Sequence, residues 1–397
     1  METPSSTFRR AWLVAAVGAT VVLLAAASQQ SQNATMLGRW SREYSLVLAL
    51  LAGVSLALWL GCLKPVQRRI WSARGPLLVL TGSLTLALVA GEVLLRILDP
   101  MGLNYHGEIA RYIELRQDDA VLEYVQPKDV EVELDGVQVH FNSSRLRGPA
   151  LSPAAAEGTR RLLVLGDSVA FGWGVEEAAI FPTRLAAGLA EATGEPWEPI
   201  NAGVCSYNTE QELLYLKHHG LALEPDLVVL VYVDNDVVTY GERWKSAEAS
   251  KPPLRRRIKR ALQQSRLVQT VSHVIKRGGG VELEGVERAL GPDDEGWKRN
   301  MQALRELTAV CAENKLPLAI YHFRWRPSAW SDALLAEARS FAAPIEIVDT
   351  TPWFADIPLP SLVNSATDSH PNAQAHGLTA ARMQQDLEQR ALLEVLD

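Results

Sequence analysis

The stretch from Asp226 to Val233 constrains the fold most, because it reads Asp-Leu-Val-Val-Leu-Val-Tyr-Val. A short run that is apolar on both faces is typical of a strand in a parallel sheet that helices cover on both sides. Further strands are predicted at Leu162–Leu165, Glu198–Ala202, Leu316–His322 and Ile345–Val348. Helices are predicted between and after them at Phe181–Thr193, Thr209–Gly220, Trp297–Asn314, Ser331–Phe341 and from Asn372 onward. Thr209-Glu-Gln-Glu212 is predicted to be the capping box that opens the second of these helices. This alternation predicts an α/β fold with a doubly wound parallel sheet.

The first hundred residues have a different character, because apolar runs crowd into them. Ala11–Ala27, Ser45–Leu63 and Leu77–Leu95 each have about the length that crosses a bilayer as a helix. The third run contains Glu92, and Arg96 one turn later lowers the cost of burying that charge. Residues 1–98 are therefore predicted to form a membrane anchor with three transmembrane helices.

The basic residues predict how this anchor is oriented. Arg9 and Arg10 precede the first run, and the 64–75 loop holds four further Lys or Arg residues. The positive-inside rule places both in the cytoplasm, so the region after Leu98 is expected outside it. The prediction is a multi-pass protein of the inner membrane with a periplasmic domain. The first run also fits a signal peptide that ends in Ala-Ala-Ala-Ser, and its cleavage would leave two spans with the same orientation.

Two other regions interrupt the α/β pattern. In residues 99–159, a small β-rich connecting region, Val130–Leu134 and Val137–Phe141 flank Asp135-Gly136 and predict a hairpin. Residues 251–280 hold nine Lys or Arg residues and no acid, with apolar residues at helical spacing. This basic helical insertion fits either a helix on anionic lipid or a solvated segment.

The charge and the cysteines exclude some functions and leave others open. The formal net charge of −7 gives no basic footprint for nucleic acid, so no nucleic-acid partner is expected. The three cysteines do not have the spacing of a metal site. Cys205 and Cys311 fit either a disulfide or two buried thiols.

Polar residues with acyl-transfer chemistry follow the predicted strands. Ser168 lies in the turn after the first strand, and Asn235 lies just after the strand that ends at Val233. Asp368-Ser-His370 precedes the last helix. The carboxyl ends of parallel strands meet at one edge of the sheet, where such folds bind ligands. There His370 can take the proton of Ser168, Asp368 can orient the imidazole, and Asn235 can donate to an oxyanion.

These motifs resemble the SGNH (GDSL-type) hydrolase family in its membrane-anchored bacterial form. The resemblance rests on Gly166-Asp-Ser with Phe171-Gly-x-Gly-Val175, on Asn235-Asp236 and on Asp368-x-His370-Pro-Asn. It implies a three-layer α/β/α, flavodoxin-like parallel sheet, an acyl-serine intermediate and neither a metal nor an organic cofactor. The residues that it assigns are the catalytic Ser168, His370 and Asp368, the oxyanion donors Ser168, Ser206 and Asn235, and the supporting Gly166, Asp167 and Gly203.

The chain departs from the family pattern at two positions. The family's more common Asp-x-x-His spacing would place the acid at Thr367, and here the acid is Asp368. The family's oxyanion glycine would fall at Ser206, five residues after Asn201, and not at Gly203. A backbone N–H is all that this role requires, but serine must then fit a turn without glycine's conformational freedom.

The resulting expectation is a membrane-tethered serine esterase that acts on an O-acyl ester, with an acylated glycan or a lipid ester as substrate. An O-acyltransferase that modifies an envelope polysaccharide is an alternative, because it shares the acyl-serine step. A catalytically inactive glycan-binding or scaffold domain is another. The sequence does not determine the substrate, the acceptor or the oligomeric state.

Overall fold

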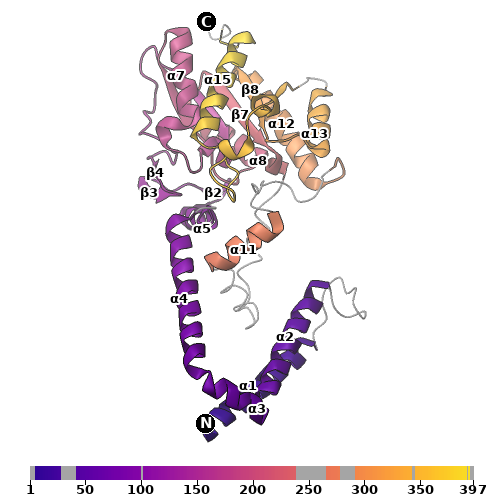
Figure 1. The fold of residues 1–397 in the computed structure, drawn as a ribbon. Coiled ribbons are helices and arrows are strands. Elements are labelled where there is room, and N and C mark those ends of the chain that lie inside the picture. The colour runs from indigo at the N-terminus through magenta and orange to yellow at the C-terminus, as the bar shows by residue number, and fades with distance from the viewer. Residues whose placement is uncertain are drawn as a thin grey trace. The chain divides into compact units, whose positions relative to one another are not determined.

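The computed structural model describes residues 5–27, 42–99, 102–237, 265–277, 291–341, 345–390 and 392–393. The chain forms two units, Met1–Val93 and Leu94–Asp397 (Figure 1). The first unit contains the helices α1 (Ser6–Ala27), α2 (Arg42–Gly61), α3 (Lys64–Ser72) and most of α4 (Arg74–Leu98). Polar side chains join α1 to α2, because Thr20 Oγ1 lies 2.9 Å from Ser55 Oγ and accepts a hydrogen bond from Trp59 Nε1.

Only one helix of the described residues is long and apolar enough to cross a membrane. It is Leu78–Leu98 within α4, and its apolar side chains are exposed. The apolar part of α2, Leu51–Gly61, rises only about 16 Å against a hydrocarbon core of about 30 Å. The structure therefore supports one candidate span, and the predicted three spans are not supported.

The second unit is built on a parallel sheet of five strands. The strands are β5 (Arg160–Gly166), β6 (Trp197–Asn201), β7 (Leu227–Val233), β8 (Leu318–Phe323) and β9 (Ile347–Asp349). Their order is β6-β5-β7-β8-β9, and every neighbouring pair is parallel. The strand order reverses between β5 and β7. Ligands bind at such a reversal in open α/β sheets, and Ser168 and Asn235 follow these two strands.

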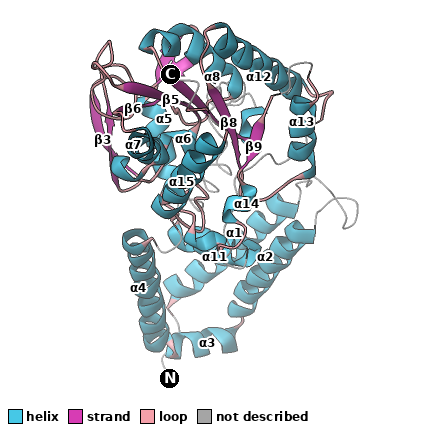
Figure 2. Cartoon of the chain, turned by 90° about the horizontal axis from the view of Figure 1, so that it is seen from above, coloured by secondary structure: helices cyan, strands magenta, loops and turns pink. Residues whose placement is uncertain are grey.

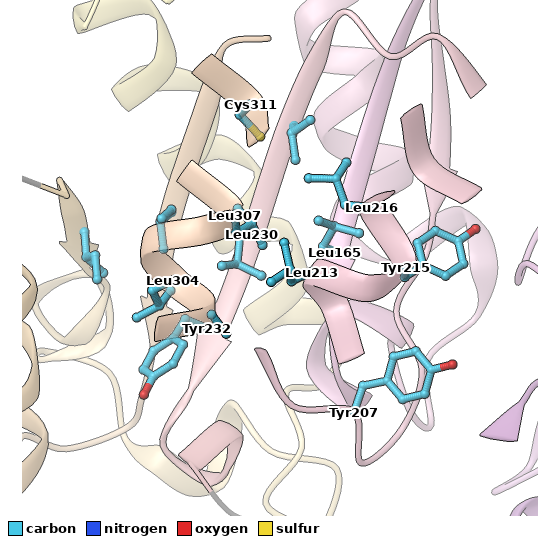
Figure 3. Close-up of a cluster of buried hydrophobic side chains, with 14 of the residues drawn as sticks. Leu165, Tyr207, Leu213, Tyr215, Leu216, Leu230, Tyr232, Leu304, Leu307 and Cys311 are labelled. Carbon is cyan, nitrogen blue, oxygen red and sulfur yellow. The ribbon is translucent and has the colours of Figure 1, made fainter. Parts of the chain in front are cut away.

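Helices cover both faces of the sheet, which confirms the predicted α/β architecture (Figures 1 and 2). The larger helices are α7 (Phe181–Thr193), α8 (Thr209–Tyr215), α12 (Glu295–Glu313), α13 (Ala329–Arg339) and α15 (Ala373–Gln389). Alternate residues of β5 point to the two opposite faces of the sheet. Leu162 and Val164 pack in the cluster that includes α7 and α15. Leu163 and Leu165 pack in the cluster of α8, α12 and α13, part of which is drawn in Figure 3.

Shorter elements connect these helices and strands. They are α6 (Ser168–Phe171), α14 (Thr351–Phe354), the 3₁₀ turns Glu177–Ala179, Leu221–Leu223, Asp234–Val237 and Leu359–Ser361, and the π turn Leu216–Gly220 that continues α8. The π turn extends α8 to the predicted end at Gly220.

The start of α8 corrects one prediction. Asn208 Oδ1 accepts a hydrogen bond from Gln211 N at 3.0 Å, and Gln211 Oε1 accepts one from Asn208 N at 3.2 Å. The capping box therefore runs from Asn208 to Gln211, and the predicted box from Thr209 to Glu212 was wrong by one residue. Asn208 has the extended backbone of an N-cap, and asparagine is a stronger N-cap than threonine.

The connecting region packs against the α/β part of the second unit. It contains α5 (Tyr105–Leu115), the pair β1 (Gln117–Asp119) and β2 (Glu123–Val125), and the predicted hairpin of β3 (Val130–Leu134) and β4 (Val137–Phe141). Asp135 and Gly136 have φ of 50° and 79°, the positive values of a two-residue type I′ turn. Tyr112 and Phe141 share a buried cluster with Phe171 and Trp173, so this region supports the turn that follows Ser168.

Two remaining predictions concern the basic insertion and the cysteines. Helix α11 (Arg266–Arg277) forms part of the predicted insertion at 251–280, and residues 251–264 and 278–280 of that insertion lie outside the described residues. Arg266 donates to the backbone oxygen of Leu103 and to the side chain of Asn104. Cys205 and Cys311 are free and buried, so the structure agrees with the thiol alternative.

Candidate active site

Ser168 is the first residue of α6, at the sharp turn that ends β5. Gly166 has φ of 151°, and a Cβ there would lie 2.7 Å from Ala170 Cβ and 3.0 Å from Val231 O, so this position requires glycine. Asp167 is the N-cap of α6, because its Oδ1 accepts the Val169 N–H at 2.8 Å. The turn therefore presents the Ser168 hydroxyl at the carboxyl end of the sheet.

The structure brings Ser168, His370 and Asp368 together. His370 Nε2 lies 2.8 Å from Ser168 Oγ, and His370 Nδ1 lies 2.6 Å from Asp368 Oδ1. The three residues are 8%, 6% and 1% exposed. Both distances are within hydrogen-bond range, so the imidazole can accept the serine proton while the carboxylate fixes its tautomer.

Asp368 is held from both sides, whereas Thr367 faces elsewhere. Asp368 Oδ1 also accepts the His370 N–H at 3.0 Å, and Oδ2 accepts Asn364 Nδ2 at 3.0 Å. Asn364 donates as well to Trp173 O at 2.9 Å. The Thr367 hydroxyl donates to Gly102 O at 2.7 Å. The structure therefore places residue 368, and not residue 367, against His370.

Asp167 links Ser168 to the proposed oxyanion donor Asn235. Its Oδ2 accepts from Ser168 Oγ at 3.1 Å and from Asn235 Nδ2 at 3.4 Å. Burial raises the pKa of Asp167, and the Val169 N–H and the nearby His370 oppose this rise. Asp167 supports the site in two ways, because it caps α6 and holds Asn235 beside Ser168.

The turn that follows β6 contains Gly203 and Ser206, which have different surroundings. The N–H of Gly203 donates to Asn201 Oδ1 at 3.0 Å, and a Cβ at this position would lie 2.2 Å from Phe171 N. Gly203 is therefore required for close packing. Ser206 has φ of 68°, and its N–H has no acceptor within the described residues. Ser206 is not among the residues that line the cavity beside Ser168.

The left-handed backbone of Ser206 gives a first testable prediction. This conformation costs about 1–2 kcal/mol for a residue with a Cβ. Glycine also increases the conformational entropy of the unfolded chain, which offsets part of this gain, so Ser206→Gly should stabilise the protein by about 1 kcal/mol. The thermal unfolding midpoint should rise for Ser206→Gly. Ser206→Ala keeps the Cβ and is the control, and an equal rise in that variant would contradict the backbone explanation.

A cavity of about 170 Å³ opens beside Ser168 and His370. Its other lining residues are Asp167, Val169, Val233, Asp234, Asn235, Phe323, Arg324, Trp325, Arg326, Ser369 and Pro371. Arg324 pairs with Asp332 and Asp349 at 2.7 Å each, and Asp234 lies 2.7 Å from His322 Nε2. Arg324 and Asp234 are therefore each paired within the protein. The sequence analysis did not name Asn364 or the Phe323–Arg326 stretch as site residues. The position of that stretch directly after a predicted strand was the signal that could have identified it.

Two buried carboxyl groups lie behind the site. Both oxygens of Glu212 and Oδ1 of Asp236 lack a hydrogen-bond partner among the described residues. Asp236 Oδ2 accepts the Val233 N–H at 3.2 Å. Burial raises the pKa of both groups well above the usual range, and the charge of Glu212 raises that of Asp236 further. The folded protein therefore favours the protonated form of these groups.

Stability should consequently fall as the pH rises above the ordinary carboxyl pKa of about 4.3, because the folded state then binds more protons than the unfolded state. Glu212→Gln removes one ionisable group from this pair and should raise stability at pH 7, with little gain at pH 4. Thermal midpoints at the two pH values test this. Glu210→Gln, an exposed neighbour on α8, is the control. A gain of equal size at both pH values would contradict the titration of Glu212.

Known proteins provide an independent comparison. No curated protein matches the chain. Among solved structures, a lipase from a goat rumen metagenome has 13% identity and a TM-score of 0.36, over 57% of this chain and 96% of its own. A psychrotrophic esterase from a Pseudoalteromonas species has 16% identity and a TM-score of 0.35, over 58% and 98%. A two-domain esterase active on acetylated mannans has 14% identity and a TM-score of 0.37, over 59% and 50%.

The family comparison covers the site itself. The model of the GDSL-like lipase/acylhydrolase family matches residues 164–378, which is more than half of the 397 residues. The match begins in β5 and includes Ser168, Asn235, Asp368 and His370. The chain belongs to the GDSL-like lipase/acylhydrolase family and is a carboxylic ester hydrolase.

Proposed function

We propose that this protein is a membrane-tethered serine esterase that removes short acyl groups, such as acetyl, from an acylated glycan. The observation that carries the proposal is the hydrogen-bonded chain from Ser168 Oγ through His370 to Asp368. In an ester hydrolase this arrangement supplies a nucleophile, a general base and an orienting acid.

The proposed reaction has two steps. Ser168 Oγ attacks the ester carbonyl while His370 Nε2 takes the hydroxyl proton, and the bond to the alcohol then breaks as His370 returns that proton to the alcohol oxygen. Water attacks the acyl-serine with His370 again as base, which releases the carboxylic acid and restores Ser168. The N–H groups of Ser168 and Ser206 and the Asn235 amide are the proposed oxyanion donors. Ser168 and Asn235 line the cavity, whereas Ser206 is assigned by its position in the motif, five residues after Asn201.

The size of the cavity supports a short acyl group. At about 170 Å³ it is smaller than the roughly 300–1,000 Å³ of pockets that hold drug-sized ligands. A long fatty acyl chain would extend beyond the cavity. The polar side chains of Asp234 and Arg326 at the same cavity support a hydroxylated alcohol portion, as in a sugar.

Membrane tethering is part of the proposal. The apolar helix Leu78–Leu98 supports it, and the four basic residues of the 64–75 stretch support a cytoplasmic start of that helix. The hydrolase domain would then lie outside the cytoplasm. Proteinase K should degrade this domain in spheroplasts without lysis, and protection until lysis would contradict this orientation.

The esterase proposal is tested with the full chain purified in detergent. A fluorophosphonate probe should label the protein, and mass spectrometry should locate the adduct on Ser168. Hydrolysis of p-nitrophenyl acetate should exceed that of p-nitrophenyl palmitate, and acetylated xylan should release acetate. Equal or better hydrolysis of palmitate would overturn the short-acyl proposal. Acetyl transfer to an added sugar in preference to water would support the acyltransferase alternative. A folded protein that the probe does not label would support the alternative of a catalytically inactive binding or scaffold domain.

A further inference from the structure

We propose that Arg116 is a positioning residue of the oxyanion hole, and that it strengthens the Ser206 N–H donor through the peptide bond between Cys205 and Ser206. This proposal rests on the oxyanion role proposed above for the Ser206 N–H. Arg116 lies in the connecting region, outside the matched residues 164–378, and follows α5 directly.

The contact that carries the proposal is made by the Arg116 guanidinium. Its Nη2 donates to the backbone oxygen of Cys205 and lies 3.4 Å from Ser206 Oγ. The oxygen of Cys205 and the N–H of Ser206 belong to the same peptide group. Arg116 therefore acts on one end of the peptide whose other end has no acceptor within the described residues.

A cation at the carbonyl oxygen changes the donor strength of the N–H. The peptide bond has partial double-bond character, so negative charge on oxygen is coupled to positive charge on the N–H. A charge-assisted hydrogen bond to the oxygen stabilises that charge distribution, and successive hydrogen bonds strengthen one another by about 10–30%. The N–H of Ser206 should consequently bind a developing oxyanion more strongly than a peptide N–H without such a partner.

The surroundings of Arg116 keep its charge available to this peptide. No carboxylate among the described residues forms an ion pair with Arg116. Its guanidinium carbon lies 4.1 Å from the Tyr124 ring centroid and 4.9 Å from that of Tyr112. Two aromatic rings offset part of the cost of burying a cation without neutralising it. The peptide oxygen of Cys205 is thus the main acceptor for this charge.

Other side chains of the connecting region hold the turn without carrying charge. Tyr124 donates to Ser206 O at 2.8 Å, Gln126 donates to Gly203 O at 2.7 Å, and Tyr112 accepts the Cys205 N–H at 3.2 Å. These bonds explain how Ser206 keeps φ of 68° without being glycine. They also separate two tasks, because several residues fix the turn and Arg116 alone among them brings a positive charge.

The test compares Arg116→Met and Arg116→Lys in the full chain, with p-nitrophenyl acetate as substrate. Acylation and deacylation both pass through an oxyanion, so Arg116→Met should lower kcat and kcat/KM together by about two- to eightfold, less than the 10²–10³ for removing a whole donor. Binding of methylboronic acid, which forms a tetrahedral adduct with serine, should weaken by a similar factor. Arg116→Lys should recover part of each loss.

The matched control is Arg161→Met. Arg161 is a fully buried arginine that donates to backbone oxygens of Ser152 and Leu223, at the opposite end of β5 from Ser168. The Arg161→Met substitution should lower the thermal unfolding midpoint and leave kcat within twofold of the wild-type value. The same pattern in Arg116→Met would show that Arg116 only holds the turn and would overturn the proposal. Turnover that survives Ser168→Ala would instead refute the underlying esterase mechanism, so the two failures are distinguishable.

Discussion

Replacing Ser168 by alanine should lower kcat for p-nitrophenyl acetate hydrolysis by about 10⁵–10⁶, because the acyl-serine can no longer form. The substitution removes one hydroxyl at the start of α6 and leaves the Asp167 cap on Val169 intact. The thermal midpoint should therefore change little, and labelling by the fluorophosphonate probe should disappear. Stopped assays of acetate release at high enzyme concentration can measure the remaining rate.

A double variant tests whether Ser168 and His370 act as one unit. His370 serves the reaction through Ser168, to which its Nε2 lies at 2.8 Å. Ser168→Ala combined with His370→Ala should therefore be no slower than Ser168→Ala alone. Ser340→Ala, at an exposed serine after α13, controls for nonspecific labelling. A Ser168→Ala variant that keeps a hundredth of the wild-type rate would place the nucleophile elsewhere.

The fold was predictable where one strand or helix carries its own pattern. The runs at Leu162–Leu165 and Asp226–Val233 are apolar on both faces, and the structure buries them between two helical layers. Asp135-Gly136 specified its turn through local chemistry alone. The capping box was misplaced by one residue because Asn208 and Thr209 both qualify as caps, and only tertiary packing buries Thr209 and Glu212. Apolar length alone also predicted more spans than the structure supports.

The site was predictable only in those residues that occupy motif positions. Ser168, Asn235 and His370 follow strand ends or precede a helix, so topology brings them together. Asn364 and Arg116 carry no such signal. Asn364 acts through Asp368, and Arg116 reaches Cys205 from 89 positions away in the sequence. Contacts of this kind depend on how the connecting region packs, which neither periodicity nor spacing reveals.

Replacing Asp368 by asparagine should lower kcat by about 10³–10⁴ and change KM little. Asp368 Oδ1 accepts from both Nδ1 and the backbone N–H of His370, at 2.6 Å and 3.0 Å. An amide that turns its NH₂ toward Nδ1 makes Nδ1 an acceptor and moves the ring proton to Nε2. The imidazole then cannot accept the Ser168 proton, although its position is unchanged.

Thr367→Val provides the matched control, because position 367 is the alternative location of the acid. Its hydroxyl donates to Gly102 O at 2.7 Å, so the variant should lose about 1 kcal/mol of stability and keep its kcat. The pair of variants thus distinguishes the two possible spacings of acid and histidine by rate alone. If Asp368→Asn retained near-normal kcat in a protein whose Ser168→Ala variant is inactive, another group would have to fix the His370 tautomer. The position of Asp368, with its Oδ2 already engaged by Asn364 at 3.0 Å, argues that Asp368 itself does so.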